Sequence, residues 1–154
     1  MKMKFINLFI ILVAIVAFAS ISISTPAFGQ DKYSVSGEIS FQEEKGQLCV
    51  WLRTQEEHEL FSKPATPARI LIIKPTPQQL QTKKASFKFV AVPKGSYSIF
   101  CLQDLNGNGK QDRSPQTGIP TETHRYSVPV IWHAQWDEIK FEVDKDVSGI
   151  EIKF

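Results

Sequence analysis

Apolar and polar residues alternate with a period of two along much of this chain. Between residues 33 and 41, Val35, Gly37, Ile39 and Phe41 share one parity, whereas serine and glutamate occupy the other. Successive side chains of a β-strand point to opposite faces, so this alternation predicts a half-buried strand. The spacing does not fit a helix, whose apolar positions recur every three or four residues.

Six further segments alternate in the same way or form short apolar runs of strand length. They are residues 48–53, 69–73, 87–91, 96–103, 139–143 and 150–154. The polar turn 43–46 predicts a hairpin between the first strand and the segment 48–53. The run 69–73 suits a strand buried on both faces or covered only at its centre. About seven strands without a long helix predict an all-β fold, a small antiparallel β-sandwich.

The first 29 residues have the pattern of a secretory signal peptide. Two lysines precede an apolar stretch, 5–19, and the small residues Ala27 and Gly29 fit cleavage before Gln30. The alternative is an uncleaved anchor, because this region approaches the ~20 residues that a membrane-spanning helix needs. We favour cleavage, which leaves residues 30–154 as a single domain that is periplasmic or secreted.

Cleavage also changes the charge of the chain. The full sequence has a net charge of +2, and the leader holds two lysines, so the remaining domain has a net charge of 2 − 2 = 0. Binding to nucleic acid depends on a basic face, so we expect no nucleic-acid partner. We also expect no stable membrane span after cleavage. A small molecule, a glycan or another protein of the cell envelope remains possible as a partner.

Cysteine and histidine offer few candidate sites. Cys49 and Cys101 both fall in predicted strands, and an oxidising compartment permits a disulfide, so a bridge and two buried free thiols both stay open. The histidines are His58, His124 and His133, and none has a second ligand at the spacing of a zinc site. We therefore expect no zinc.

The most specific pattern is a series of oxygen-bearing side chains at every second position. Asp104, Asn106, Asn108 and Asp112 match the spacing of a calcium-binding loop, with the carbonyl oxygen of Lys110 as a further ligand. Calcium prefers six to eight oxygen ligands, and the glycines in this stretch allow the tight winding that such a loop requires. Calcium is therefore the candidate cofactor.

The carboxylate that normally closes such a loop is missing. Its position is taken by Pro115, so Glu122 is the candidate that would fold back to complete the site. Two carboxylates and two amides predict weak binding, with a dissociation constant of ~10⁻⁴ to 10⁻³ M and a structural role. The alternative is a plain polar turn, because Asn106-Gly107 and Asn108-Gly109 are hairpin signals without any metal.

A longer pattern places this loop between flanking motifs. It combines Val92–Tyr97, the loop itself, Gly118–Pro120, Glu122 and Ser127. The combination resembles the bacterial secreted family called domain of unknown function 2141, roughly over the whole mature chain. The resemblance implies a small periplasmic or secreted β-sandwich of immunoglobulin-like or transthyretin-like appearance, also similar to carboxypeptidase-regulatory-like domains. It implies no established enzymatic activity.

Three classes of function remain open. We favour a non-catalytic binding or structural domain whose loop is stabilised by calcium. A second class is an aromatic platform for sugar or peptide formed by Trp132 and Trp136, although such residues also pack on cores. A third is a hydrolase, for which Glu122, Asp112 and His124 are the plausible acid and base groups. No nucleophile motif surrounds any serine, so we do not expect an enzyme.

Overall fold

The computed structural model describes residues 31–59, 69–130 and 134–154. The predicted signal peptide, its cleavage point and Trp132 and His133 lie outside these residues. Within them, no helix is long and apolar enough to cross a membrane.

Strands dominate the described chain, as the sequence predicts. They are β1 (Lys32–Ser40), β2 (Gln47–Arg53), β3 (Ile70–Ile73), β4 (Lys84–Pro93), β5 (Gly95–Asp104), β6 (His124–Tyr126), β7 (Phe141–Val143) and β8 (Val147–Lys153). Three short helices are α1 (Gln55–Glu59), α2 (Pro77–Thr82) and α3 (Trp136–Ile139). The all-β prediction is confirmed, with eight strands among the described residues in place of about seven. The strand that the sequence pattern missed is β6, which has three residues.

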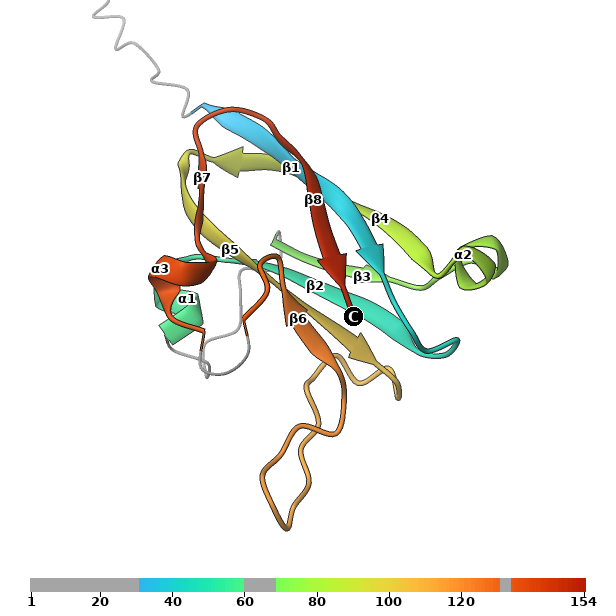
Figure 1. Ribbon diagram of the computed structural model, residues 1–154. Helices are drawn as coiled ribbons and strands as arrows, with labels where there is room; N and C mark the ends of the chain where they lie inside the picture. Colours follow the sequence, from blue (N-terminus) through green and yellow to red (C-terminus); the bar gives the residue numbers. More distant parts are fainter. Residues whose placement is uncertain (1–30, 60–68, 131–133) are drawn as a thin grey trace, which may run out of the picture.

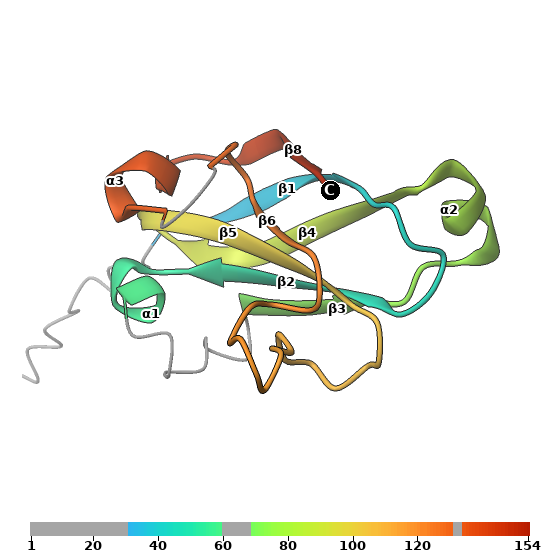
Figure 2. The same ribbon diagram turned by 60° about the horizontal axis from the view of Figure 1, so that its bottom comes forward.

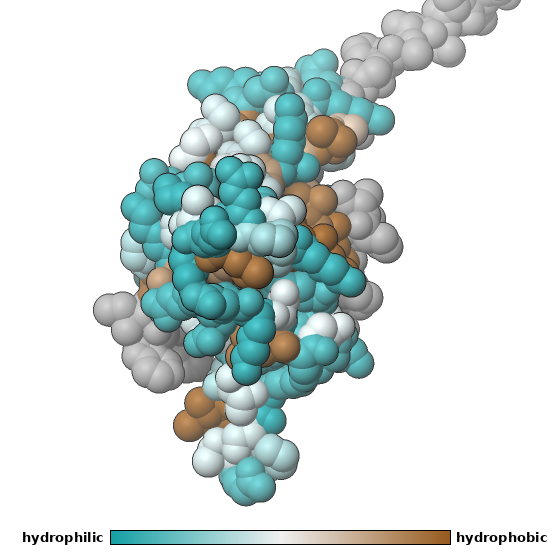
Figure 3. Space-filling view, turned by 90° about the vertical axis from the view of Figure 1, so that its right-hand side faces the viewer, coloured by the Kyte–Doolittle hydropathy of each residue, from teal (hydrophilic) through white to brown (hydrophobic). Residues whose placement is uncertain are grey.

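The strands form two sheets that face one another as a β-sandwich (Figures 1 and 2). One sheet has the order β4-β1-β8 and the other β3-β2-β5-β6, and β7 pairs separately with β5. The pairing is antiparallel throughout except between β1 and β8, which run parallel. The end of the sandwich that carries α2 exposes mainly polar side chains, with apolar atoms in small patches (Figure 3).

The main core lies between the two sheets and follows the predicted alternation. Val35 and Ile39 of β1 and Phe89 of β4 are buried against Val50 and Ile99 from the opposite sheet. Each such side chain contributes roughly 1.5–3 kcal/mol when it leaves water. The residues between them on the same strands point outward, which explains the period of two in the sequence.

The hairpin predicted between the first two strands is wrong. β1 pairs with β4 and β8, whereas β2 pairs with β3 and β5 in the other sheet. The turn at 93–95 likewise connects β4 to β5 across the two sheets. Both members of each pair turn an apolar face to the same core, so alternation alone does not distinguish sheet neighbours from facing strands.

The apolar run 69–73 forms a strand, as predicted, but the burial on both faces suggested for it is wrong. Its strand, β3, lies at the edge of the five-stranded sheet, and β2 is its one partner among the described residues. Leu71 and Ile73 pack against the core, but Ile72 is 56% exposed. Ile72 pairs with Cys49 and so points to the outer face of the sheet, where its side chain stays largely in water.

The centre of the five-stranded sheet is buried on both faces. On the face away from the main core, Cys49, Phe100 and Leu102 are buried, with Trp51 and Tyr126 packed against them. We call these five residues the outer cluster. It explains why the segment 96–103 shows no clean alternation, since both of its faces are covered.

The register of β2 and β5 shows that the two cysteines are not joined in a disulfide. Cys49 pairs with Leu102, and its neighbour Val50 pairs with Cys101, so the two thiols point to opposite faces of one sheet. Both are buried and free. Burial, with a further contribution from Asp104, raises the pKa of Cys49 to about 12. Burial also raises the pKa of Cys101 above its ordinary value.

We therefore expect neither thiol to react in the native protein at neutral pH, because the thiolate is the nucleophile. Iodoacetamide should label both cysteines only after denaturation, whether or not a reductant is present, and mass spectrometry would show this. A denatured protein that takes up the label only after reduction would contain a disulfide and contradict the structure.

The contact between β1 and β8 requires a glycine at position 37. A Cβ at Gly37 would lie 2.0 Å from the carbonyl oxygen of Ile150 on β8 and 2.8 Å from the Phe87 ring. The backbone oxygen is held in the parallel ladder, so it has little room to move. Gly37 therefore allows the last strand to join the three-stranded sheet.

Gly37→Ala should lower the free energy of unfolding by roughly 1–3 kcal/mol or more, because it overpacks a backbone contact. Chemical denaturation provides the measurement, and Ser36→Ala on the same strand is the control. Equal midpoints for the two variants would contradict the close approach of β1 and β8.

Candidate functional site

The predicted calcium loop begins where β5 ends. The connection from β5 to β6 projects beyond the sandwich (Figure 1) and has two parts. The first part winds from Asp104 to Asp112. The second is a small hairpin, in which Ser114 N–H donates to the Ile119 carbonyl at 2.9 Å and Thr121 N–H donates to the Asp112 carbonyl at 2.9 Å.

The carboxylate of Asp104 is fully buried at the base of the loop. It accepts hydrogen bonds from the N–H groups of Gly107 and Gly109, both at 2.7 Å, and from the Gln47 side chain of β2 at 2.9 Å. A longer bond from Asn108 N–H measures 3.3 Å. Burial alone would raise the pKa of Asp104, but these donors together lower it below its ordinary value. Asp104 thus organises the loop as an anion.

Three other predicted ligands converge on the exposed side of the loop. The amide nitrogens of Asn106 and Asn108 lie 2.5 Å and 3.0 Å from the carboxylate oxygens of Asp112. The amide oxygens accept N–H groups two residues further on, at 3.0 Å from Asn108 and 2.7 Å from Lys110. The winding therefore gathers a carboxylate and two amides at one place.

Glu122 folds back onto the loop, as the sequence suggests for the missing carboxylate. One oxygen accepts Leu105 N–H at 2.8 Å, and the other accepts Asp112 N–H at 3.1 Å. The side chain is buried, with 6% exposed. In this position Glu122 joins Leu105, near the start of the winding, to Asp112 at its end, so it closes the loop through backbone amides.

These contacts define how a cation would fit. The oxygen-only donor set suits a hard ion such as Ca²⁺. Among the described residues no group of three or more His, Cys, Asp or Glu side chains gathers at one point, so amide and main-chain oxygens would have to contribute. An ion beside Asp112 would require Asn106 and Asn108 to turn their amide oxygens toward it. The fit is therefore best on the exposed side of the loop.

The groups considered for a hydrolase lie close together but have other partners. His124 Nδ1 lies 2.7 Å from the Gln111 side-chain nitrogen. Burial lowers the pKa of His124, and the nearby positive charges of Arg125 and Arg113 lower it further. Both oxygens of Glu122 receive backbone N–H groups. Glu122 is therefore placed as a structural acceptor in this conformation.

Trp136, one half of the predicted aromatic platform, begins α3 and is half-buried. Its ring lies 5.9 Å from that of His58 in α1, and His58 also lies 5.9 Å from Tyr126. His58 Nε2 is 3.0 Å from the carbonyl oxygen of Ala134. These contacts join α1 and α3. The other half, Trp132, lies outside the described residues.

Sequence reasoning missed two contributors to this region. Gln47 looks like an ordinary polar residue beside a turn, yet it is buried and donates to Asp104. Arg53 lies 4.6 Å from the centre of the Phe100 ring, over the outer cluster. No signal in the sequence points to this contact, because it depends on the pairing of β2 with β5.

The buried loop base, the Gly-Ile-Pro hairpin and the returning glutamate are the features on which the family resemblance rests. A model of uncharacterized proteins conserved in bacteria (DUF2141) matches residues 39–151. The chain belongs to this DUF2141 family. The match extends from the end of β1 into β8, so it includes both sheets and the loop of this family member. No curated protein and no solved structure matches the chain.

Asp104→Asn should destabilise the metal-free protein by roughly 1.5–3 kcal/mol, because hydrogen bonds to a charged acceptor are lost and an amide nitrogen faces N–H donors. Asp112→Asn, on the exposed side of the loop, should change stability by less than about 0.5 kcal/mol. Denaturation with urea in the presence of a chelator measures both. Equal losses would contradict the structural role of the buried carboxylate.

The pH dependence follows from the lowered pKa of Asp104. Because the native carboxyl holds its proton less tightly than the unfolded one, its stabilisation is present above the ordinary value of 3.8. It is lost as the pH falls through the native pKa. Asp104→Asn should therefore show a smaller loss of stability below about pH 4 than the unaltered protein. Identical acid profiles by circular dichroism would contradict the assignment.

Proposed function

We propose that this chain is an exported, non-catalytic binding or structural domain whose loop at 104–112 binds calcium. The observation that carries the proposal is that the three carboxylates of the loop have different hydrogen-bond partners. Asp104 and Glu122 close the loop through backbone N–H groups, and Asp112 is left on its exposed side with Asn106 and Asn108. To receive a hard cation beside Asp112, the wound loop would have to turn the amides of Asn106 and Asn108.

The role of the ion would be structural rather than catalytic. The ion would replace the contacts between Asp112 and the two asparagines. It would thereby hold the end of the winding in place, where the small hairpin begins. Weak affinity suits the periplasm or the exterior, where extracellular modules bind calcium with dissociation constants of ~10⁻⁴ to 10⁻³ M. The location outside the cytoplasm rests on the predicted signal peptide.

The absence of catalysis is part of the proposal. A general base needs a carboxylate or imidazole that can reach a substrate proton, and here Glu122 is buried against two backbone amides. His124 binds Gln111 through Nδ1. These partners favour a structural assignment over acid-base chemistry for the loop.

Thermal unfolding with a chelator, with calcium and with magnesium tests the calcium site. Calcium at ~100 times its dissociation constant should stabilise the native protein by about 2.7 kcal/mol, which shifts the midpoint by several degrees. Asp112→Asn should abolish this shift while the metal-free midpoint stays the same. Magnesium, which prefers a rigid octahedral site with waters, should have a smaller effect.

The matched control is Asp144→Asn, which removes an exposed carboxylate from the turn between β7 and β8. This variant should keep the full response to calcium. The calcium proposal fails if 10 mM calcium, on the order of ten times the weakest expected dissociation constant, leaves the midpoint unchanged. It also fails if Asp112→Asn and Asp144→Asn respond alike.

A further inference from the structure

One side of the sandwich has two unpaired strand edges next to each other. β6 ends the five-stranded sheet and β8 ends the three-stranded sheet, and the described residues provide no further strand beside either. The two edges come close without pairing. Unpaired edges expose backbone N–H and C=O groups and can accept another strand.

The register shows which groups of β6 are available. Ser127 N–H donates to the Ile99 carbonyl, and Gln103 N–H donates to the Thr123 carbonyl. With this pattern, the Arg125 backbone pairs with Cys101, and the backbones of His124 and Tyr126 point away from β5. Tyr126 therefore offers a backbone donor and acceptor to the outside. His124 offers its N–H, and its carbonyl becomes available when the Arg125 guanidinium, which it accepts at 2.8 Å, turns to a ligand.

The same reasoning applies to β8. Phe154 N–H donates to the Ser40 carbonyl on β1, so the even-numbered residues at this end of β8 direct their backbone groups toward β1. The backbones of Glu151 and Lys153 consequently point away from β1. A groove of about 1100 Å³ runs along this side, lined by residues of both edges and of the loop hairpin.

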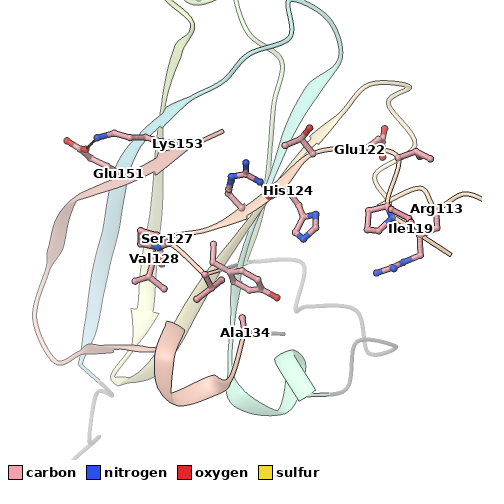
Figure 4. Close-up of a pocket in the computed structure, with 16 residues that line it drawn as sticks. Arg113, Ile119, Glu122, His124, Ser127, Val128, Ala134, Glu151 and Lys153 are labelled. Atoms are coloured by element: carbon pink, nitrogen blue, oxygen red, sulfur yellow. Dashed lines mark hydrogen bonds and ion pairs between the residues drawn. The ribbon is translucent and has the colours of Figure 1, made fainter. Parts of the chain in front are cut away.

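Three cationic side chains and two carboxylates line this groove, and both carboxylates have partners of their own. Lys153 is paired with Glu151 at 2.6 Å, and Glu122 is turned into the loop. Arg113 donates to the Gly118 carbonyl and the Gln111 side chain, and Arg125 donates to the His124 carbonyl. Figure 4 shows the Glu151 and Lys153 pair on one side of His124 and Arg113 on the other. Among the described residues, neither arginine forms an ion pair with a carboxylate.

We propose that an extended, acidic segment of a partner protein adds as a strand to the edge of β6. Its backbone would pair with His124 and Tyr126, and its carboxylates would bind Arg113 and Arg125. This mode combines main-chain hydrogen bonds with side-chain selection, and the planar guanidinium groups suit carboxylates. The inference names a partner for the binding role proposed above and rests on that role, but it does not depend on calcium.

The charges and the shape favour this occupant over others. A second copy of the chain paired through the same edge would bring like charges together, because each copy carries both arginines. A small carboxylate would use the arginines but leave the backbone edge unpaired. An extended acidic peptide uses both features of the groove.

The test uses a peptide of about ten residues with alternating glutamate and valine, a length typical of strand recognition. Titration into ¹⁵N-labelled protein should give saturable shifts of the His124 and Tyr126 amide signals. The double variant Arg113→Gln/Arg125→Gln should weaken binding about tenfold or more. The same peptide with alternate backbone nitrogens methylated should also bind about tenfold or more weakly, because it loses donors to one edge.

The charge-matched control is Lys88→Gln/Lys145→Gln, which removes two exposed lysines that lie outside the groove. It should bind the peptide like the unaltered protein. Equal weakening in this control would overturn the location, and equal binding of the methylated peptide would overturn strand addition in favour of charge alone. The absence of saturable binding below ~1 mM, the weak end of specific recognition, would overturn the proposal as well. Calcium-dependent melting is read separately, so either proposal can fail while the other stands.

Discussion

A buried carboxylate connects the sandwich of this protein to its longest described loop. Asp104 is the last residue of β5, and it receives N–H groups from the loop as well as the side chain of Gln47 from β2. A buried carboxylate without such donors would be costly, so the loop must wind around it. The geometry of the loop is therefore set by the need to satisfy one charge at the end of a central strand.

The position of β6 depends on the same arrangement. This strand has only three residues, and its chain arrives from the loop that Glu122 closes by binding Leu105 and Asp112. A strand so short gains little from its own ladder, so the closed loop helps to hold it beside β5. The loop thereby positions the unpaired edge of β6. Arg113 from the hairpin and Arg125 from β6 both line the groove beside this edge.

The sequence predicted the faces of strands better than their partners. The alternation in β1 identified Val35 and Ile39 as core residues, but it could not show that β2 lies in the opposite sheet. In β5 the buried outer cluster hid the alternation altogether. Other features depend on contacts between distant segments and could not be predicted from local patterns. They are the sheet order, the exposure of Ile72, the faces of the two cysteines, the role of Gln47, the contact of Arg53 with Phe100, the strand β6 and the groove.

By itself, the sequence determined the fold class, the family and the residues of the candidate loop, because periodicity and side-chain spacing are local properties. It placed Asp104, Asp112 and Glu122 together as candidate oxygen ligands. Only the tertiary structure separated their roles, since a carboxylate's environment depends on which strands and amides enclose it. Burial and backbone donors make Asp104 and Glu122 supports of the loop, while the half-buried Asp112 contacts two exposed asparagines.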